Sequence, residues 1–215
     1  RRPNRCFRLD SAGYGSTSRG FPVHWLEVLR QFLTRNKEIG AIAESSDGLA
    51  ELITECASVE TAKVVLELGP GTGSFTRALL RRGIPEGQLV LLEQSPDFTT
   101  LLRNSFPEAT VICGDAKDVA AIMRPLGIEE VNEIVSGIPL NAMGGRLRRI
   151  ICDEAFKLLR LGGSFVQVSY LPRCSIPNNI ITAYSAKKIY CGLALGNIPP
   201  GFVWRAEKHC VRGQS

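Results

Sequence analysis

Short apolar runs recur along the chain from residue 63 onward, and amphipathic stretches of helical length separate them. The runs predicted as strands cover residues 63–68, 89–93, 110–113, 133–136 and 164–169. The helices predicted between them include residues 73–82, 98–105 and 146–159. Such alternation predicts a mostly parallel sheet with helices on both faces. Two more strand-like runs, 184–195 and 202–208, are joined only by N-I-P-P-G and predict an antiparallel hairpin, which completes a seven-stranded sheet.

The chain ahead of the first strand has a different pattern. Residues 1–20 mix arginine with glycine and serine and predict a mobile basic arm. Residues 22–37 carry apolar side chains at helical spacing and predict an amphipathic helix, whose apolar stripe either packs on the core or docks at a membrane interface. A loop at 40–46 and a second helix at 48–59 are expected to follow. The predicted division is therefore an arm (1–20), a helix–loop–helix segment (21–60) and an α/β domain (61–215).

Composition narrows the class of protein. The chain has 215 residues, of which 44% are apolar, enough for one α/β domain with a sizeable core. The net charge of +5 favours an anionic partner, either nucleic acid or an anionic membrane surface. Seven cysteines without a C-x-x-C pair, and only two histidines, argue against a structural metal site or a disulfide framework. Most of the cysteines are expected to be small buried hydrophobes, and the lack of a signal-peptide pattern predicts a cytoplasmic protein.

A glycine-rich loop follows the first strand. The segment E-L-G-P-G-T-G lies where that strand meets the next helix, which is where sheets of this kind hold ligands. Because position 74 is serine, the run is G-x-G-x-G and lacks the G-x-G-x-x-G spacing of a dinucleotide site. S-Adenosylmethionine has no pyrophosphate and carries positive charge, so an acidic residue before the loop suits it. The predicted contacts from this loop are Glu67, Gly69, Pro70, Gly71 and Gly73.

Acidic residues also follow the second and third strands. Glu93 closes the second strand and could accept hydrogen bonds from both ribose hydroxyls, with Gln94 beside it. Asp115, with Ala116 after it, follows the third strand and could bind the adenine amine. A helix N-cap is the alternative role for Asp115. Together with the glycine loop, these positions predict S-adenosylmethionine as the cofactor.

The segment S-G-I-P-L ends the fourth strand, where a methyltransferase of this layout brings the acceptor to the methyl group. Ser136 and Gly137 are expected to border the cofactor, and Ile138, Pro139 and Leu140 the acceptor. Enzymes that methylate base nitrogens have an aromatic ring at the last position. Leu140 cannot stack on a base, a contribution of roughly 1–3 kcal/mol, so this segment argues against a nucleobase acceptor.

Taken together, several segments resemble the bacterial phospholipid N-methyltransferases, a family of class I S-adenosylmethionine-dependent methyltransferases. They are R-Q-F-L-T-R-N-K-E-I-G-A-I-A-E-S-S, V-L-E-L-G-P-G-T-G-S-F-T-R-A-L-L, L-L-E-Q-S-P-D-F, I-V-S-G-I-P-L, L-G-G-S-F-V-Q-V-S-Y and N-I-P-P-G-F-V-W-R. The resemblance runs from about Trp25 to Lys208. It implies a Rossmann-like fold and methyl transfer to the amine of phosphatidylethanolamine at the inner face of the membrane. Whether repeated transfer yields phosphatidylcholine is left open.

The resemblance also implies roles for residues outside the cofactor loops. Tyr170, at the end of the fifth strand, would bind the headgroup through its hydroxyl or its ring, unless it is a core-edge aromatic. Ser136 and Glu44 are the other catalytic candidates, with Glu44 on a loop that covers the cofactor pocket. Arg173 would pair with the lipid phosphate. The membrane contacts expected from the amphipathic helix are Trp25, Leu29, Arg30, Phe32 and Leu33.

Other functions remain as alternatives at this stage. The same sheet and positive charge would serve an RNA or DNA adenine methyltransferase, although no nucleic-acid partner is expected from the S-G-I-P-L segment. A methyltransferase-like module without activity and a small-molecule methyltransferase are further alternatives. The sequence leaves open the number of methyl groups transferred, the proton acceptor and the oligomeric state.

Overall fold

The computed structural model describes residues 40–58, 63–196 and 200–209. The basic arm and the amphipathic helix predicted at 22–37 lie outside this part of the chain. The membrane residues predicted there therefore stay predictions: Trp25, Leu29, Arg30, Phe32 and Leu33.

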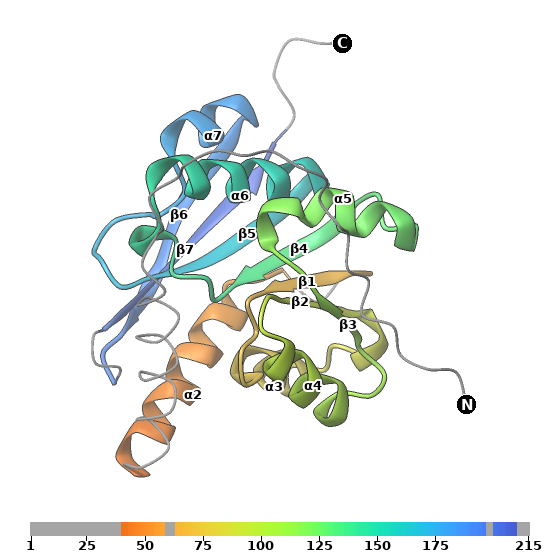
Figure 1. The fold of residues 1–215 in the computed structure, drawn as a ribbon. Coiled ribbons are helices and arrows are strands. Elements are labelled where there is room, and N and C mark those ends of the chain that lie inside the picture. The colour runs from red at the N-terminus through yellow and green to blue at the C-terminus, as the bar shows by residue number, and fades with distance from the viewer. Residues whose placement is uncertain (1–39, 59–62, 197–199, 210–215) are drawn as a thin grey trace, which may run out of the picture.

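One mixed sheet of seven strands organises the molecule (Figure 1). The strands are β1 (Val65–Leu68), β2 (Leu89–Glu93), β3 (Thr110–Cys113), β4 (Val131–Ser136), β5 (Leu159–Ser169), β6 (Ala186–Ala194) and β7 (Gly201–Lys208). Their order is β3-β2-β1-β4-β5-β7-β6. The first five strands pair in parallel, and β7 pairs antiparallel with both β5 and β6. The predicted fold class, including its hairpin, is confirmed. Because the winding direction reverses between β1 and β4, a ligand is expected at their carboxyl ends.

Helices cover both faces of the sheet. They are α2 (Gly40–Glu55), α3 (Ser74–Arg81), α4 (Pro96–Ser105), α5 (Val119–Met123), α6 (Gly145–Leu158) and α7 (Asn178–Ala183). Short 3-10 helices lie at Glu86–Gln88, Ala116–Asp118, Arg124–Leu126 and Leu140–Ala142. Side chains of α2, α3 and α4 share one core with Val65, whereas those of α5, α6 and α7 share the other with Leu66. Successive side chains of β1 thus point to opposite faces of the sheet and pack into two separate cores.

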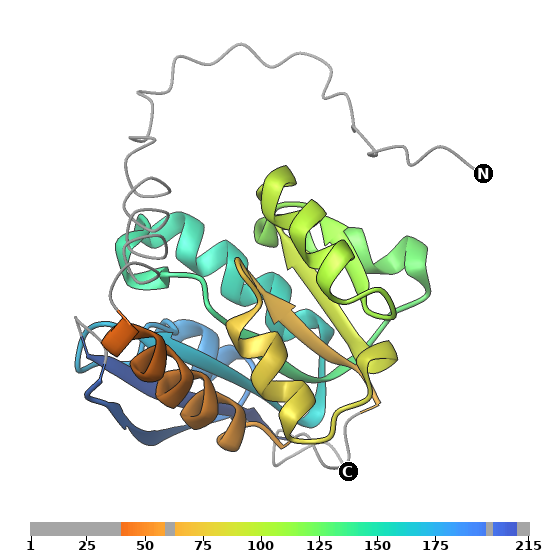
Figure 2. The ribbon, with the colours of Figure 1, turned by 90° about the horizontal axis from the view of Figure 1, so that it is seen from below.

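The hairpin of β6 and β7 packs directly beneath α2, which lies beside α3 in Figure 2. A Cβ atom on Gly201 would come within 2.8 Å of Leu49 Cδ1, and one on Gly192 within 3.1 Å of Leu52 Cδ1. Glycine at both positions therefore lets the helix approach the strands closely. None of the helices in the described ranges is long and apolar enough to cross a membrane.

Two sequence predictions about helices are corrected by the structure. Residues 40–46 were predicted to form a loop, but they begin α2, which starts at Gly40. The run A-I-A-E contains no proline, and alanine favours helix, so nothing in it stops the helix from beginning early. The run 184–195 was predicted as strand throughout, whereas β6 starts at Ala186 and is preceded by α7, which was missed. Pro177 at the N-cap of α7 was the available signal.

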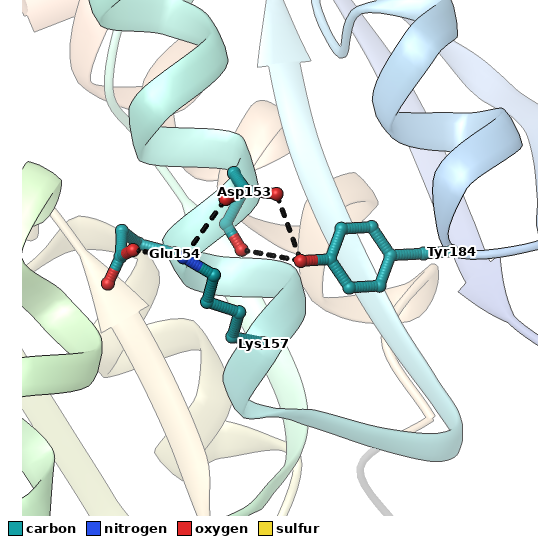
Figure 3. A network of polar contacts seen from close by, with 4 residues as sticks. All are labelled: Asp153, Glu154, Lys157 and Tyr184. Atoms are coloured by element: carbon teal, nitrogen blue, oxygen red, sulfur yellow. Dashed lines mark hydrogen bonds and ion pairs between the residues drawn. The ribbon is translucent and has the colours of Figure 1, made fainter.

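A polar network joins α6 to the segment after α7 (Figure 3). Tyr184 donates a hydrogen bond to Asp153 Oδ1 at 2.9 Å. Lys157 pairs with Asp153 at 3.0 Å and with Glu154 at 2.6 Å. Burial and the bond to Asp153 raise the pKa of Tyr184 to about 12. The network contains none of the predicted site residues, so we assign it to the stability of this helical layer.

Cysteines in the described part of the chain are free thiols. Only Cys152 is fully buried, whereas Cys56, Cys113, Cys174 and Cys191 are partly exposed. The prediction that most cysteines are buried is therefore met by Cys152 alone among these residues. Cys56 and Cys191 are hydrogen-bonded to each other where α2 meets β6. No group of His, Cys, Asp and Glu in the described ranges could hold a metal ion.

Candidate cofactor and acceptor site

The loops predicted to bind the cofactor meet at the carboxyl ends of β1 to β4. Backbone hydrogen bonds continue the pairing past the strand ends, from Gly69 N to Leu92 O (2.9 Å) and from Gly114 N to Glu93 O (2.9 Å). A third bond runs from Gly137 N to Leu68 O (3.0 Å). These bonds hold the four loops at one edge of the sheet, as the switch in strand order requires.

The glycine loop needs glycine for its backbone conformation. Gly69, Gly71 and Gly73 have φ angles of 68°, 57° and 82°, in the left-handed region that disfavours other residues. A Cβ atom on Gly69 would also come within 2.9 Å of Ile138 Cγ1. Gly73 is the N-cap of α3, so the loop delivers the first amides of that helix to the same edge.

Glu93 is tied to the glycine loop. Its Oε2 accepts the N–H of Gly71 at 3.0 Å, and its Oε1 accepts the N–H of Ser95 at 2.9 Å. The residue is only 8% exposed. Each carboxylate oxygen keeps one further lone-pair direction, so both can still accept hydrogen bonds from a diol such as ribose.

Glu67 lies beneath the loop with an unsatisfied oxygen. It is fully buried, and its Oε2 accepts the hydroxyl of Thr76 at 2.7 Å, while its Oε1 has no partner. Burial raises the pKa of Glu67 to about 7, opposed by the bond from Thr76. A buried acidic group that lacks a partner is costly unless a cation or donor meets it. The residues present therefore fit a positively charged cofactor such as S-adenosylmethionine.

Asp115 adopts the helix-capping role that the sequence left as the alternative. Its carboxylate accepts the N–H of Lys117 at 3.0 Å at the start of the Ala116–Asp118 turn. It also pairs with the Lys117 ammonium at 3.1 Å and accepts a bond from Gln94 Nε2 at 3.4 Å. The structure thus brings Gln94, Asp115 and Ala116 together. A contact of Asp115 with adenine stays a prediction.

The S-G-I-P-L segment forms a tight turn between the glycine loop and β5. Ser136 is fully buried, and its Oγ accepts the N–H of Ile138 at 3.4 Å. A Cβ atom on Gly137 would lie 3.0 Å from Gly69 O, so this turn and the glycine loop are in close contact. Gln167 on β5 donates from Nε2 to Ile138 O at 2.8 Å. The hydroxyl of Ser136 serves the turn in this geometry, and its catalytic role stays a prediction.

A pocket of about 220 Å³ opens beside this turn. Its walls come from the segment after β4 and from the end of β5. The lining residues are Pro139, Leu140, Asn141, Ala142, Val168, Ser169, Tyr170 and Leu171. Two predicted acceptor residues, Pro139 and Leu140, therefore share one pocket with Tyr170. Arg173 is not among the lining residues and lies exposed on the turn that follows, where its N–H bonds Leu171 O at 2.7 Å.

Two polar residues of this pocket, Asn141 and Ser169, were not predicted from the sequence. Asn141 Nδ2 donates to Ser169 Oγ at 2.7 Å, and Ser169 Oγ donates to Leu171 O at 2.8 Å. The only sequence signal was position, because Asn141 directly follows S-G-I-P-L and Ser169 directly precedes Tyr170. Burial raises the pKa of Tyr170, so its phenol stays protonated at neutral pH. The pocket therefore offers amide and hydroxyl groups within an otherwise apolar lining.

The local structure predicted for Glu44 is wrong. Glu44 lies within α2 and not on a loop covering the cofactor pocket, because the helix begins four residues earlier, at Gly40. The position of its side chain lies outside what the structure describes.

Relatives of the chain are found by comparison with known proteins. No protein-family model matches the chain. An ornithine lipid N-methyltransferase of Singulisphaera acidiphila is 33% identical over 147 residues, which cover 67% of this chain and 77% of that protein. A probable ribosomal RNA small subunit methyltransferase A of Methanopyrus kandleri is 30% identical over 150 residues, covering 69% of this chain. The chain spans about half of that second relative, 49% of its length.

Solved structures share the fold at low sequence identity. An O-methyltransferase family protein from Burkholderia thailandensis aligns with a TM-score of 0.56 at 11% identity, over 77% of this chain and 56% of that one. DesVI of Streptomyces venezuelae aligns with a TM-score of 0.55 at 16% identity, over 87% of this chain and 100% of that one. At these identities the likeness concerns the fold alone.

The chain belongs to the class I S-adenosylmethionine-dependent methyltransferases. Within that class, it shares about a third of its aligned residues (33%) with a lipid N-methyltransferase. The predicted cofactor, S-adenosylmethionine, is the one that defines the class, and that prediction is confirmed.

Proposed function

We propose that the protein methylates the amine of phosphatidylethanolamine at a membrane surface. The observation that carries this proposal is the pocket beside the S-G-I-P-L turn, where Leu140 and Tyr170 face an opening of about 220 Å³. Such a space suits a small headgroup rather than a stacked base, since Leu140 stands where a nucleobase enzyme has a ring. The identity to a lipid N-methyltransferase supports an aminolipid as the acceptor class.

The residues around the glycine loop bind and orient the cofactor in this proposal. Glu93 accepts the ribose hydroxyls, Gln94 and Asp115 face the adenine edge, and Glu67 meets the positive charge from below. When bound, S-adenosylmethionine supplies a methyl group activated by its sulfonium. Because Glu93 and Asp115 accept backbone hydrogen bonds and Glu67 is buried, these three groups need little reorganisation on binding.

The acceptor amine must reach the pocket neutral and correctly oriented. An alkylammonium with a pKa of about 10 has to lose a proton before it attacks. Asn141 Oδ1 accepts one bond from Arg148 Nη1 and keeps a second lone-pair direction that can orient a remaining N–H bond, whereas Ser169 Oγ is fully used in holding Asn141 and Leu171. Burial keeps the Tyr170 phenol protonated, so we assign its ring to cation–π attraction for methylated ammonium products rather than to proton removal.

The membrane part of the proposal rests on the sequence. The net charge of +5 favours an anionic surface, and the amphipathic pattern at 22–37 suits insertion at the headgroup level. We therefore place the enzyme on the inner face of the cytoplasmic membrane, anchored through Trp25, Leu29, Arg30, Phe32 and Leu33. Arg173, exposed beside the pocket, is proposed to pair with the lipid phosphate.

A second candidate is methylation of adenine in ribosomal RNA. The relative of Methanopyrus kandleri, a probable ribosomal RNA methyltransferase, favours it, and so does the positive net charge. The missing ring at Leu140 argues against it.

The test is transfer of labelled methyl from S-adenosylmethionine to phosphatidylethanolamine in anionic vesicles, with ornithine lipid and total RNA offered in parallel. Labelled phosphatidylethanolamine that is lost in Glu93→Ala would support the proposal. Label in ornithine lipid alone would change the acceptor, and label in RNA alone would overturn the lipid assignment.

A further inference from the structure

The amino end of α6 carries an unusual charge pattern. Three arginines, Arg146, Arg148 and Arg149, lie within its first five residues, and its first turn contains no acidic residue. Positive charge at this end opposes the helix dipole. Within the described ranges, no ion pair joins any of the three to a carboxylate. Arg149 attracts Asp153 one turn further along the helix, but the helix dipole gives no reason for a cluster of three arginines at this end.

Arg148 connects the cluster to the acceptor pocket. Its Nη1 donates to Asn141 Oδ1 at 3.3 Å, and Asn141 in turn bonds Ser169 in the pocket wall. The Nε of Arg148 is buried and has no hydrogen-bond partner. Arg146 and Arg149 are exposed. The amino end of α6 lies on the same side of the molecule as the loop after β5 (Figure 1), so positive charge borders the pocket.

We propose that Arg148, supported by Arg146 and Arg149, binds the acidic group of the acceptor headgroup and so selects zwitterionic aminolipids. The proposal rests on the lipid N-methyltransferase function argued above and adds its substrate class. In such a lipid, one headgroup carries both the amine and an anion. The amine would enter the pocket while the anion meets these arginines at its rim, together with Arg173 where that anion is a phosphate.

The chemistry of guanidinium suits this role. It remains charged at all working pH values and can bind phosphate or carboxylate with two parallel hydrogen bonds. In phosphatidylethanolamine, two carbon atoms separate the amine from the phosphodiester, whereas an amino-acid headgroup carries a carboxylate instead. Either anion satisfies the arginines, so the experiment must separate the two sources.

The first experiment compares acceptors with the whole chain of residues 1–215. Arg148→Gln and Arg148→Lys are assayed on phosphatidylethanolamine, on ornithine lipid and on oleylamine, a long-chain amine without an anion, all in mixed micelles. We expect Arg148→Gln to raise KM at least about tenfold for the zwitterionic lipid that the enzyme uses, with kcat changed less than about threefold and oleylamine unaffected. Arg148→Lys should recover part of the loss, because it keeps the charge but not the planar fork.

The matched control is Arg160→Gln. Arg160 is exposed near the start of β5, at the opposite end of that strand from Ser169 and Tyr170, and its loss should leave KM unchanged. Equal losses on the lipids and on oleylamine would show that Arg148 only supports Asn141, which overturns the proposal. So would unchanged kinetics in Arg148→Gln.

A binding measurement separates this proposal from the function on which it rests. Phosphoethanolamine is titrated by calorimetry into protein loaded with S-adenosylhomocysteine. Weaker binding in Arg148→Gln than in wild type and Arg160→Gln supports the anion site even if no lipid is methylated, in which case the proposed function alone fails. Equal binding in all three proteins, together with normal methylation of lipid, would overturn the anion site alone.

Discussion

The carboxylate of Glu93 accepts the backbone N–H of Gly71 at 3.0 Å, so the acid that ends β2 closes the glycine loop that follows β1. This bond joins two of the sequence signals for the cofactor into one unit. The same carboxylate also accepts the N–H of Ser95 and is nearly buried. Glu93 is therefore both a predicted ribose ligand and a structural support of the loop.

Replacing Glu93 should weaken cofactor binding, and alanine should weaken it more than glutamine. Glu93→Gln keeps the shape but replaces one carboxylate oxygen by an NH2 group, which cannot accept from its backbone donor, and Glu93→Ala removes both acceptors. Charge-assisted hydrogen bonds are worth about 1.5–3 kcal/mol each, so affinity for S-adenosylmethionine should fall at least about tenfold in Gln and further in Ala. Isothermal titration calorimetry measures both.

Glu86→Ala is the matched control for Glu93. Glu86 also accepts two backbone N–H groups, from Glu108 at 2.7 Å and Ala109 at 3.3 Å, but at the amino end of β2. It should lower stability without changing affinity. Unchanged affinity in Glu93→Ala would rule out its role in the cofactor site.

The left-handed glycine of the loop allows a test of geometry. Gly69→Ala should reduce both stability and cofactor affinity, because Gly69 has a φ of +68° and its Cβ would meet Ile138 Cγ1 at 2.9 Å. Gly83→Ala measures the cost of the left-handed backbone conformation without a clash, since Gly83 has a φ of +87° and open space around it. We expect Gly83→Ala to cost about 1–2 kcal/mol with normal affinity. Similar affinities in the two variants would contradict the importance of this close approach.

Stability should depend on pH through two buried carboxyl groups. Burial raises the pKa of Glu67 and of Glu133 to about 7 each, against about 4.3 for glutamate in an unfolded chain. Between these values the folded protein holds protons that the unfolded chain has lost. The contribution of these two groups to the free energy of unfolding is therefore fully present below about pH 4.5 and is lost as pH rises through 7.

Denaturation in urea from pH 5 to 8 measures this fall. Glu67→Gln and Glu133→Gln should each flatten the profile, by roughly 3 kcal/mol at most. Added S-adenosylmethionine should flatten the pH profile of the wild type and of Glu133→Gln, because a cation beside the Glu67 carboxyl favours its ionised form. It should not change the profile of Glu67→Gln. A wild-type slope in Glu67→Gln would show that this carboxyl does not titrate in the range.

Tyr170 tests how the pocket handles methylated amines. With monomethylated phosphatidylethanolamine as the acceptor, Tyr170→Phe keeps the ring and should retain activity within about threefold, whereas Tyr170→Ala should lose about thirtyfold in kcat/KM, since a desolvated cation–π contact is worth about 2 kcal/mol. Tyr190→Ala removes a ring that is 50% exposed and packs on Trp204, away from the pocket lining, and serves as the control. A Phe variant as weak as Ala would assign the effect to the hydroxyl instead.

Local sequence patterns were enough to predict much of the fold and the cofactor loop. The strands β2 and β3 have the predicted bounds, because each is a short apolar run between a turn and a polar strand end. The glycine loop was found because its backbone conformation demands glycine at 69, 71 and 73. Helix boundaries were weaker. The start of α2 and the whole of α7 lack strong local signals, so propensity and packing decided them.

By itself, the sequence determined the class of fold, the cofactor loop and the acids that follow β2 and β3, since each depends on residues close together in the chain. Only the tertiary structure decided the acceptor pocket. The bond from Asn141 to Ser169 joins positions 28 residues apart on different strand ends, and Arg148 meets them from a helix. Such contacts depend on how β4, β5 and α6 pack against one another, and no local spacing of residues encodes that arrangement.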